Sequence, residues 1–312
     1  MSEVSVRILL ATYNGSTYIR QMVDSVLAQD HGDFQLILSD DGSSDGTADI
    51  LQNYAEEYPD RVIHYCSGIR FGSAQKHFMH LLKTFPDARY TMFCDQDDVW
   101  HSNKISKTLG KMRELEADPS VPVLVHTDLC VVDGQLQVIS PSFCAHSALD
   151  GKRTALNQLL VQNVVTGCTV MINHALSELA CRTEDCSAMR MHDWYLALLA
   201  SAAGKIGFVE EATIDYRQHG NNAVGAKNVR SPAYLWNRLR SQKMRQGLML
   251  AAEQAKGFLR CYEDILDPGQ KEMVSAFAET ATMQLLRRNR VYLKYGLLKS
   301  GIVRVAAQLL GW

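Results

Sequence analysis

The sequence predicts an α/β protein with a doubly wound, mostly parallel sheet and a helical extension at its C-terminus. Short apolar runs alternate with amphipathic helical segments through the first third of the chain, which is the pattern of βα units in a parallel sheet. Polar residues gather where these runs end. Because ligands bind beyond the carboxyl ends of strands in such sheets, the functional residues are expected there.

The first third of the chain supplies alternating strands and helices. Strands are expected over residues 4–11, 34–38, 61–65 and 90–93. Helices are expected over residues 18–27, around 50–54, over 74–84 and over 103–117. Each helix shows apolar residues at helical spacing, as Tyr18, Met22 and Val26 do.

The middle of the chain is less regular. We expect a fifth strand and a turn over residues 123–133, loops over 134–150, and a loop that leads into a strand over 162–172. An apolar helix is expected to open at His192, and two short strands are expected near Ile206 and Ile214.

From Ser231 onward the pattern is helical only. Pro232 is well placed at a helix start, and the Asp267-Pro268-Gly269 segment separates two helical sections. We therefore expect one α/β domain over residues 1–226 and a basic helical region over residues 227–312.

The composition is that of a globular protein without a membrane span. The chain has 312 residues, 46% of them hydrophobic, which is enough for a sizeable core. It has no run of about twenty apolar residues, and its N-terminus leads into a strand without the pattern of a signal peptide. The eight cysteines form no CxxC pair, so we expect reduced thiols in a cytoplasmic protein.

The net charge of −2 hides an uneven distribution. Residues 227–312 contain 15 Lys and Arg against 6 acids, whereas residues 1–226 contain 17 basic and 28 acidic residues. Residues 285–312 have six bases and no acid, so we expect an interfacial helix on an anionic membrane surface. The alternative is a helical bundle packed on the domain with a solvated basic face.

Three carboxylates lie within four positions after the 90–93 run: Asp95, Asp97 and Asp98. Like charges this close repel, and burial without a partner is costly. A hard divalent cation such as Mg²⁺ or Mn²⁺ would relieve the repulsion and would also bind phosphate oxygens. We therefore expect a metal–diphosphate site. The alternative is a cap for the helix that begins near Asn103, for which one acid would suffice.

The order of these motifs over residues 4–222 resembles inverting glycosyltransferases of family 2, which have the GT-A fold. The segments that carry the resemblance are Asp95-Gln96-Asp97-Asp98-Val99-Trp100 and Tyr216-Arg217-Gln218-His219-Gly220-Asn221-Asn222. Within the family, both segments look most like bacterial rhamnosyltransferases of surface polysaccharide assembly.

The resemblance implies a set of contacts to a nucleotide-sugar donor. These residues are Thr12, Tyr13, Asn14, Asp40, Asp41, Arg70, Lys76, Asp95 and Gln96. Tyr13 would stack on a pyrimidine ring, and Asp41, or next Asp40, would accept the imide N–H of uracil or thymine. Arg70 and Lys76 would face the diphosphate. The alternatives are a capped turn over residues 40–43 and two solvated surface cations.

The resemblance also implies the metal ligands and the base. Asp97 and His219 would bind Mg²⁺ or Mn²⁺, although a lone histidine is more often structural. Asp193 would be the base, because inversion needs one displacement with the acceptor hydroxyl deprotonated opposite the leaving nucleotide. Its alternative is a helix N-cap. The acceptor side would be lined by Gly167, Cys168, His192 and Trp194.

The activity so implied is metal-dependent transfer of L-rhamnose from dTDP-β-L-rhamnose to a glycan or lipid-linked glycan in polysaccharide or O-antigen biosynthesis. The protein would be peripheral on the inner face of the cytoplasmic membrane, without a nucleic-acid partner. A UDP-hexose donor is the alternative within the same chemistry. A metal-dependent phosphohydrolase or nucleotidyltransferase, and a non-catalytic polysaccharide-binding scaffold, are the alternatives from other classes.

Overall fold

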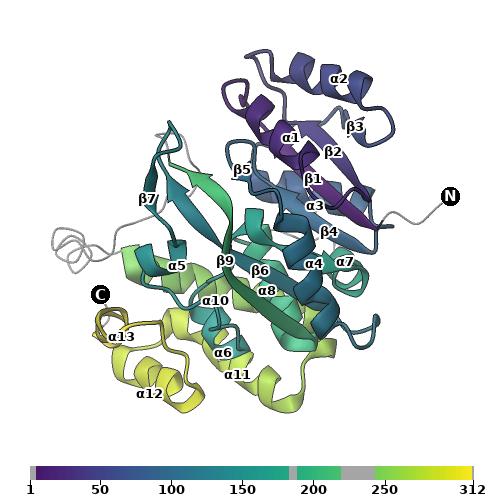
Figure 1. The fold of residues 1–312 in the computed structure, drawn as a ribbon. Helices are drawn as coiled ribbons and strands as arrows, with labels where there is room; N and C mark the ends of the chain where they lie inside the picture. Colours follow the sequence, from purple (N-terminus) through teal and green to yellow (C-terminus); the bar gives the residue numbers. More distant parts are fainter. Residues whose placement is uncertain (1–4, 183–187, 219–242, 311–312) are drawn as a thin grey trace.

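The computed structural model describes residues 5–182, 188–218 and 243–310 (Figure 1). Its first third alternates strands and helices as the sequence predicts. The elements are β1 (Val6–Thr12), α1 (Ile19–Leu27), β2 (Phe34–Asp40), α2 (Thr47–Glu57), β3 (Val62–His64), α3 (Ala74–Thr84), β4 (Tyr90–Cys94), β5 (Val99–Trp100) and α4 (Lys104–Leu115). The apolar stripe that predicted α1 is buried, as Met22 and Val26 show.

The middle of the chain completes the sheet. Its elements are β6 (Val123–Val132), β7 (Val138–Ser140), α5 (Phe143–His146), α6 (Leu156–Val161), the 3₁₀ turn η1 (Gly167–Thr169), β8 (Met171–Asn173), α7 (His174–Cys181), α8 (His192–Ala203) and β9 (Lys205–Arg217). Within the described residues the strands form a nine-stranded sheet in the order β3-β2-β1-β4-β8-β6-β9-β5, and β7 pairs with β6.

The sheet consists of two parallel parts joined by one reversed strand. β1 is parallel to β2 and β4, and β2 is parallel to β3. β8 runs antiparallel to both β4 and β6, and β6 is parallel to β9. The carboxyl ends of β1, β2 and β4 therefore meet at one edge. The predicted α/β fold with a mostly parallel sheet and C-terminal helices is confirmed.

Two local predictions in the middle of the chain are wrong. The stretch predicted as two short strands near Ile206 and Ile214 is one strand, β9. Thr127 of β6 faces Val209, but the next residue of β6, Asp128, faces Ala212. The chain therefore bulges between these two pairs, and the sequence pattern made that bulge look like a gap. The stretch 134–150, predicted as loop, contains the short elements β7 and α5.

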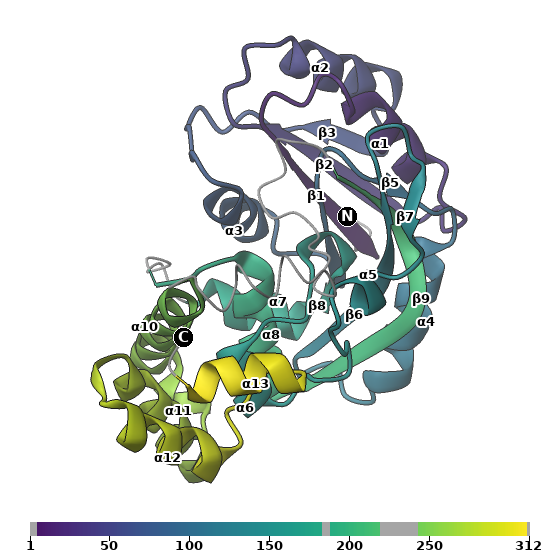
Figure 2. The ribbon, with the colours of Figure 1, turned by 90° about the vertical axis from the view of Figure 1, so that its left-hand side faces the viewer.

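Helices cover both faces of the sheet, as the two perpendicular views show (Figure 2). On one face α1, α2 and α4 bury Met22, Leu51 and Ile105 in a shared cluster. On the other face α3 and α8 bury Phe78 and Leu199 in a second cluster. The sheet is thus enclosed between two apolar layers, which is the doubly wound arrangement.

The C-terminal region packs on the second of these layers. Its helices are α10 (Lys243–Tyr262), α11 (Pro268–Ala278), α12 (Leu285–Tyr295) and α13 (Ile302–Leu309), with 3₁₀ turns η2 (Glu263–Ile265) and η3 (Glu279–Thr282). Phe258, Phe277 and Tyr292 belong to the same buried cluster as Leu199 of α8. Asp267 caps α11 at the break that the sequence predicts. The expected boundary at residue 226 lies outside the described residues, so the two-domain division stays a prediction.

Residues 285–310 are not the single interfacial helix expected from their charge. Gly296 has a φ of 63° and Gly301 a φ of 80°, a backbone conformation that suits glycine, and the segment between them separates α12 from α13. Arg304 donates to the carbonyls of Ala148 and Ser147, so part of the basic charge binds the rest of the chain. These contacts favour the packed bundle. No helix among the described residues could span a bilayer.

The chain after α8 passes so close to Pro122 that position 204 has no room for a side chain. A Cβ at Gly204 would lie 1.8 Å from the carbonyl oxygen of Pro122, which also accepts the backbone N–H of Lys205 at 2.9 Å. We expect Gly204→Ala to lower the free energy of unfolding by more than about 2 kcal/mol, because the backbone must move. Urea unfolding followed by circular dichroism measures the change.

The matched control is Gly110→Ala in α4, where a Cβ meets nothing within 4 Å. Alanine should stabilise that helix by about 0.5–1 kcal/mol. If Gly204→Ala unfolds at the same urea concentration as the native chain, the close approach to Pro122 is not real.

Candidate active site

A cleft of about 710 Å³ opens at the carboxyl ends of β1 and β4. This is the edge at which the sequence predicts a ligand, and the volume is that of a small-molecule site. The lining comes from the turn after β1, the loop before α3, the acidic loop after β4 and the start of α8. It includes Tyr13, Arg70, Asp97 and Asp193.

Gln96 holds the turn after β1. Its Oε1 accepts the backbone N–H of Tyr13 at 2.8 Å and the hydroxyl of Thr12, and its Nε2 donates to the carbonyl of Tyr13 at 3.2 Å. A Cβ at Gly15 would lie 2.6 Å from Gln96 Oε1, so any larger residue there would displace the Gln96 side chain. Tyr13 is 44% exposed and lines the cleft, which leaves its ring available to a nucleobase.

Asn14 and Asp40, two of the predicted donor contacts, do not line the cleft. Asn14 joins the turn after β1 to the turn after β2, whereas Asp40 binds within the turn after β2. Asn14 Oδ1 accepts the N–H of Ser44 at 3.0 Å, and the Asn14 N–H donates to Ser43 Oγ at 2.7 Å. Asp40 Oδ2 accepts the N–H groups of Gly42 and Ser43 at 3.1 and 2.7 Å. The capped-turn alternative therefore describes Asp40.

Asp41 does line the cleft, and it is 5% exposed. Its Oδ1 accepts the N–H of Phe71, and its Oδ2 accepts the N–H of Gly72 at 2.8 Å. The carboxylate thus fastens the loop before α3 to the end of β2. A carboxylate has more acceptor positions than these two bonds use, so Asp41 can still accept the N–H of a base.

The two predicted cations lie in different surroundings. Arg70 lines the cleft, donates from Nη2 to the hydroxyl of Tyr13 at 2.8 Å, and places its guanidinium 5.2 Å from the centre of the Tyr13 ring. Lys76 is exposed and is not among the residues that line the cleft. A diphosphate in the cleft would meet Arg70, whereas Lys76 fits the solvated alternative.

The acids after β4 lie close together at the cleft. Asp95 and Asp97 line the cleft, whereas Asp98 is fully buried. Burial and the charges of Asp97 and Asp193 raise the pKa of Asp95 to about 7. Burial and the charges of Asp97 and Asp95 also raise the pKa of Asp98. The carboxylates therefore carry repulsion that the surrounding protein does not fully offset.

This donor set fits a hard divalent cation. Asp95, Asp98 and Cys168 each bring one oxygen or sulfur within 4.8 Å of the others, and carboxylate oxygens suit Mg²⁺ or Mn²⁺. Burial raises the pKa of Cys168, so its thiol stays protonated and the carboxylates are the useful ligands. Asp97, the predicted ligand, adds its charge from the cleft side. His219, the second predicted ligand, lies outside the described residues.

Arg217 is 2% exposed, and it binds the acidic loop from the protein interior. Its Nε donates to the carbonyl of Asp97 at 2.8 Å, its Nη1 to the carbonyl of Gly134 at 2.8 Å, and its Nη2 to Gln21 Oε1 at 2.7 Å. Its backbone N–H donates to Asp98 Oδ1 at 3.2 Å. The late motif that includes Arg217 therefore positions the acids.

Lys104 places a second cation beneath the same loop. Its Nζ is fully buried, 4.7 Å from the centre of the Trp100 ring. Burial lowers its pKa to about 8, and the nearby Cys168, Cys94 and Asp98 act in the opposite direction. Lys104 is therefore still mostly charged at neutral pH and partly balances the buried acid.

Asp193 lies in the first turn of α8 and lines the same cleft. Burial raises its pKa to about 7, and the backbone N–H groups of Trp194 and Gly167 act against that rise. Met191, not Asp193, takes the N-cap position of α8. A carboxylate with this pKa is poised to accept a proton near neutral pH.

Of the four predicted acceptor-side residues, three line the cleft: Gly167, His192 and Trp194. Cys168 does not, because its side chain is buried against the acidic loop. His192 lies 4.5 and 5.1 Å from the ring centres of Phe78 and Phe93, and burial lowers its pKa to about 3, so it is neutral. A Cβ at Gly167 would lie 2.8 Å from His192 Nε2.

Several residues of the lining were missed by the sequence analysis, among them His77 and Arg190. His77 Nε2 lies 2.8 Å from Ser39 Oγ, within hydrogen-bond distance, and the His77 ring stacks on the Phe71 ring with 4.7 Å between the ring centres. Arg190 places its guanidinium 5.4 Å from the Trp194 ring, so a cation flanks the acceptor side. The proximity of Arg190 to Asp193, three residues later in the sequence, could have indicated that Arg190 lines the cleft. His77 gave no such signal, because it fits the regular helical pattern of α3.

Comparison with known proteins defines the relatives of this chain. Residues 7–178 match the family described as Glycosyl transferase family 2. The chain is 27% identical over 233 residues to the dTDP-rhamnosyl transferase RfbG of Shigella flexneri, across 70% of this chain and 74% of that protein. It is 21% identical over 328 residues to an uncharacterized glycosyltransferase of Rickettsia typhi, across 98% of this chain and 95% of the relative.

Solved structures share the fold at low identity. TarS residues 1–349 from S. aureus in complex with UDP superposes with a TM-score of 0.56 and 16% identity, over 92% of this chain and 77% of that one. The mannosyltransferase PcManGT from Pyrobaculum calidifontis, in complex with GDP-Man and Mn²⁺, gives 0.55 and 16%, over 99% and 79%. The fold and the cleft thus define a glycosyltransferase of the GT-A type. The chain belongs to glycosyl transferase family 2, as the motifs predicted.

The role of Arg217 can be tested without removing its charge. Arg217→Lys cannot reach the carbonyls of Asp97 and Gly134 together with Gln21, because an ammonium lacks the planar fork of donors. We expect a loss of about 2–4 kcal/mol in the free energy of unfolding, because buried acceptors lose their partners, together with weaker turnover. Chemical unfolding and initial rates measure both effects.

Arg182→Lys is the matched control, because Arg182 pairs with Asp264 at 2.6 Å on the surface. An exposed ion pair contributes less than about 1 kcal/mol. Native stability in Arg217→Lys would exclude the positioning role.

Proposed function

We propose that this protein is an inverting glycosyltransferase that transfers L-rhamnose from dTDP-β-L-rhamnose to a cell-surface polysaccharide precursor. One observation carries the proposal: the acidic loop with Asp95 and Asp97 lines the same cleft as Asp193, and the charge of Asp193 raises the pKa of Asp95. A leaving-group site and a base in one cleft are what glycosyl transfer requires.

The donor assignment is supported by the relative from Shigella flexneri, which is named as a dTDP-rhamnosyl transferase. In the proposed complex the ring of Tyr13 stacks on thymine, and Asp41 accepts the imide N–H. Arg70, bound to the Tyr13 hydroxyl, faces the diphosphate. A UDP-hexose is the second candidate, because a uracil ring offers the same imide N–H to Asp41.

The proposed reaction is a single displacement. The acceptor hydroxyl gives its proton to Asp193, its oxygen bonds to the anomeric carbon, and the bond from that carbon to the diphosphate oxygen breaks. The nucleoside diphosphate leaves with the electron pair, and the β-linked donor yields an α-L-rhamnoside. This needs one catalytic carboxylate, unlike the pair in most glycosidases. A Mg²⁺ or Mn²⁺ ion held at the acidic loop, with Asp97 as the proposed ligand and Asp95 beside it, would stabilise the charge of the leaving diphosphate.

The acceptor side of the proposed complex is formed by Gly167, His192 and Trp194. The indole N–H of Trp194 donates to the carbonyl of Leu159 at 2.6 Å, which fixes the ring at the cleft for stacking on a sugar. Arg190 beside this ring suits an acceptor that carries phosphate. We propose a glycan or lipid-linked glycan acceptor, and a peripheral position on the inner face of the cytoplasmic membrane.

Donor and metal can be tested together by thermal unfolding. We expect dTDP-rhamnose with Mn²⁺ to raise the melting temperature more than UDP-hexoses do, because a ligand that binds only the native state stabilises it by mass action. Asp97→Asn should lose the Mn²⁺-dependent part of this shift, and its transfer rate should fall by at least about a hundredfold. Release of dTDP measures the rate.

Asp60→Asn is the control for both readouts, because Asp60 is exposed and lies outside the cleft. If a UDP-hexose gives a larger rise in melting temperature and faster turnover than dTDP-rhamnose, the donor is a UDP-hexose. An Asp97→Asn protein with a native Mn²⁺ response would reject the metal assignment.

The base assignment predicts a pH dependence. Because burial raises the pKa of Asp193 to about 7, the carboxylate is protonated below that pH and cannot accept a proton. The transfer rate should therefore fall about tenfold per pH unit below about pH 7 and level off above it. Asp193→Asn should bind dTDP normally but lose at least about a thousandfold in rate. Rates of Asp193→Asn like those of Asp60→Asn would remove Asp193 as the base.

A further inference from the structure

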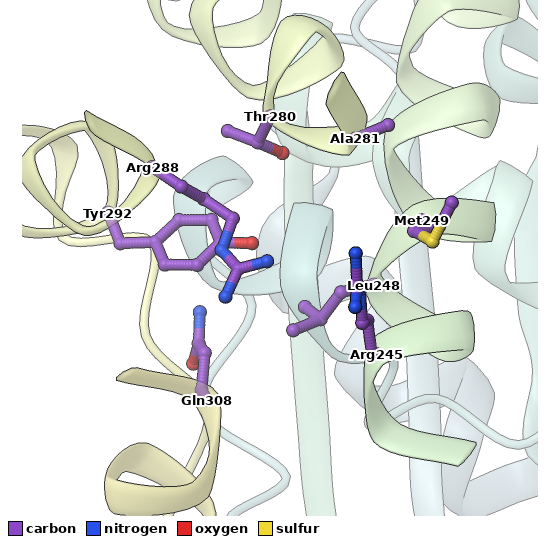
Figure 3. A pocket seen from close by; sticks show the side chains of 8 residues that line it. All are labelled: Arg245, Leu248, Met249, Thr280, Ala281, Arg288, Tyr292 and Gln308. Carbon is purple, nitrogen blue, oxygen red and sulfur yellow. The ribbon is translucent and has the colours of Figure 1, made fainter. Parts of the chain in front are cut away.

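Two arginines converge in the C-terminal region, away from the cleft (Figure 3). Arg245 comes from the first turn of α10 and Arg288 from α12, and both guanidinium groups point into one small pocket. Tyr292, Thr280 and Gln308 complete its polar wall. We call this pocket the arginine notch. The guanidinium of Arg288 lies 5.9 Å from the centre of the Tyr292 ring.

Within the part of the chain that the structure describes, no acid neutralises the positive charge of the arginine notch. No carboxylate among the described residues forms an ion pair with Arg245 or Arg288, and the Arg288 Nε is buried without a hydrogen-bond partner there. Glu253, Glu263, Asp264 and Glu272 pair with other cations. Of the remaining acids of residues 243–310, Asp267 caps α11, and Glu279 lines a separate pocket with Arg287. Two facing guanidinium groups without an acid are an anion site.

The dimensions of the notch select the kind of anion. Its enclosed space is about 10 Å³, roughly the room of one water molecule. A nucleotide or a sugar is therefore too large to enter. Arg245 is exposed, so its side chain can turn toward an anion at the mouth. We propose that the arginine notch binds a terminal phosphate, with one oxygen inside and the others held by the two arginines.

The surroundings favour a phosphate that belongs to a lipid. Met249, one helical turn after Arg245, lines the notch and is 42% exposed, and Leu285, three residues before Arg288, is 41% exposed. Residues spaced in this way share a helix face. Apolar side chains beside a phosphate site can enter the headgroup region while the arginines hold the phosphate. The notch thus extends the proposed peripheral attachment by naming the residues that recognise the membrane.

The experiment measures binding of the full-length protein to vesicles. Phosphatidylcholine vesicles are compared with vesicles that also contain phosphatidic acid, or phosphatidylserine at equal surface charge. We expect the native chain to prefer phosphatidic acid, which offers a terminal phosphate. Arg245→Gln with Arg288→Gln should weaken that binding at least about tenfold and abolish the preference. Arg245→Gln alone, at an exposed position, should give part of the loss.

The matched control is Arg287→Gln with Arg290→Gln, which removes the same charge from exposed positions of α12. It should keep the preference for phosphatidic acid, and melting temperatures report whether each variant folds. The notch is not the binding site if both double variants lose vesicle binding equally. The proposal also fails if the native chain shows no preference for phosphatidic acid. If inorganic phosphate at low millimolar concentration displaces the protein from phosphatidic acid vesicles, the notch binds free phosphate and the claim that its ligand is a lipid phosphate is wrong. Binding needs no donor, so these outcomes do not depend on glycosyl transfer.

Discussion

The active-site architecture depends on one electrostatic constraint, the accumulation of carboxylates at the end of β4. Asp95 and Asp193 both have pKa values raised to about 7, and burial also raises the pKa of Asp98. Lys104 offsets this only in part from inside the protein. Because Arg217 and Gln96 fix the backbone around the acids, the carboxylates cannot separate to relieve their repulsion. A cation would relieve this repulsion, which agrees with the proposed metal site.

The reversed strand explains how residues so distant in sequence reach this cleft. β8 is antiparallel to β4, and its first residue, Met171, lies opposite Met92 near the carboxyl end of β4. The residues just before β8, including Gly167, consequently lie at the same edge as the acidic loop. Gly167 then donates its N–H to Asp193. One change of strand direction thus joins the acidic loop to Asp193.

Much of the fold and of the cleft could be predicted from sequence, because short-range patterns carry that information. The apolar period of α3 and the acids after β4 are local signals, and both lie where they were expected. Other features depend on partners far along the chain. Nothing near Asn14 shows that its side chain binds the turn after β2, and nothing near Cys168 shows that it is buried behind the acids. The Arg217 contacts to Gln21, Gly134 and Asp97 likewise need the folded sheet.

The bonds of Asp41 bear on how donor preference can change in such a protein. Its two oxygens hold the N–H groups of Phe71 and Gly72, so the carboxylate that would read the base is oriented by the backbone of residues 66–73. Altering that loop would tilt the carboxylate without replacing it. Engineering a different nucleotide preference would therefore mean transplanting the loop together with the aspartate, since the backbone of the loop orients the carboxylate.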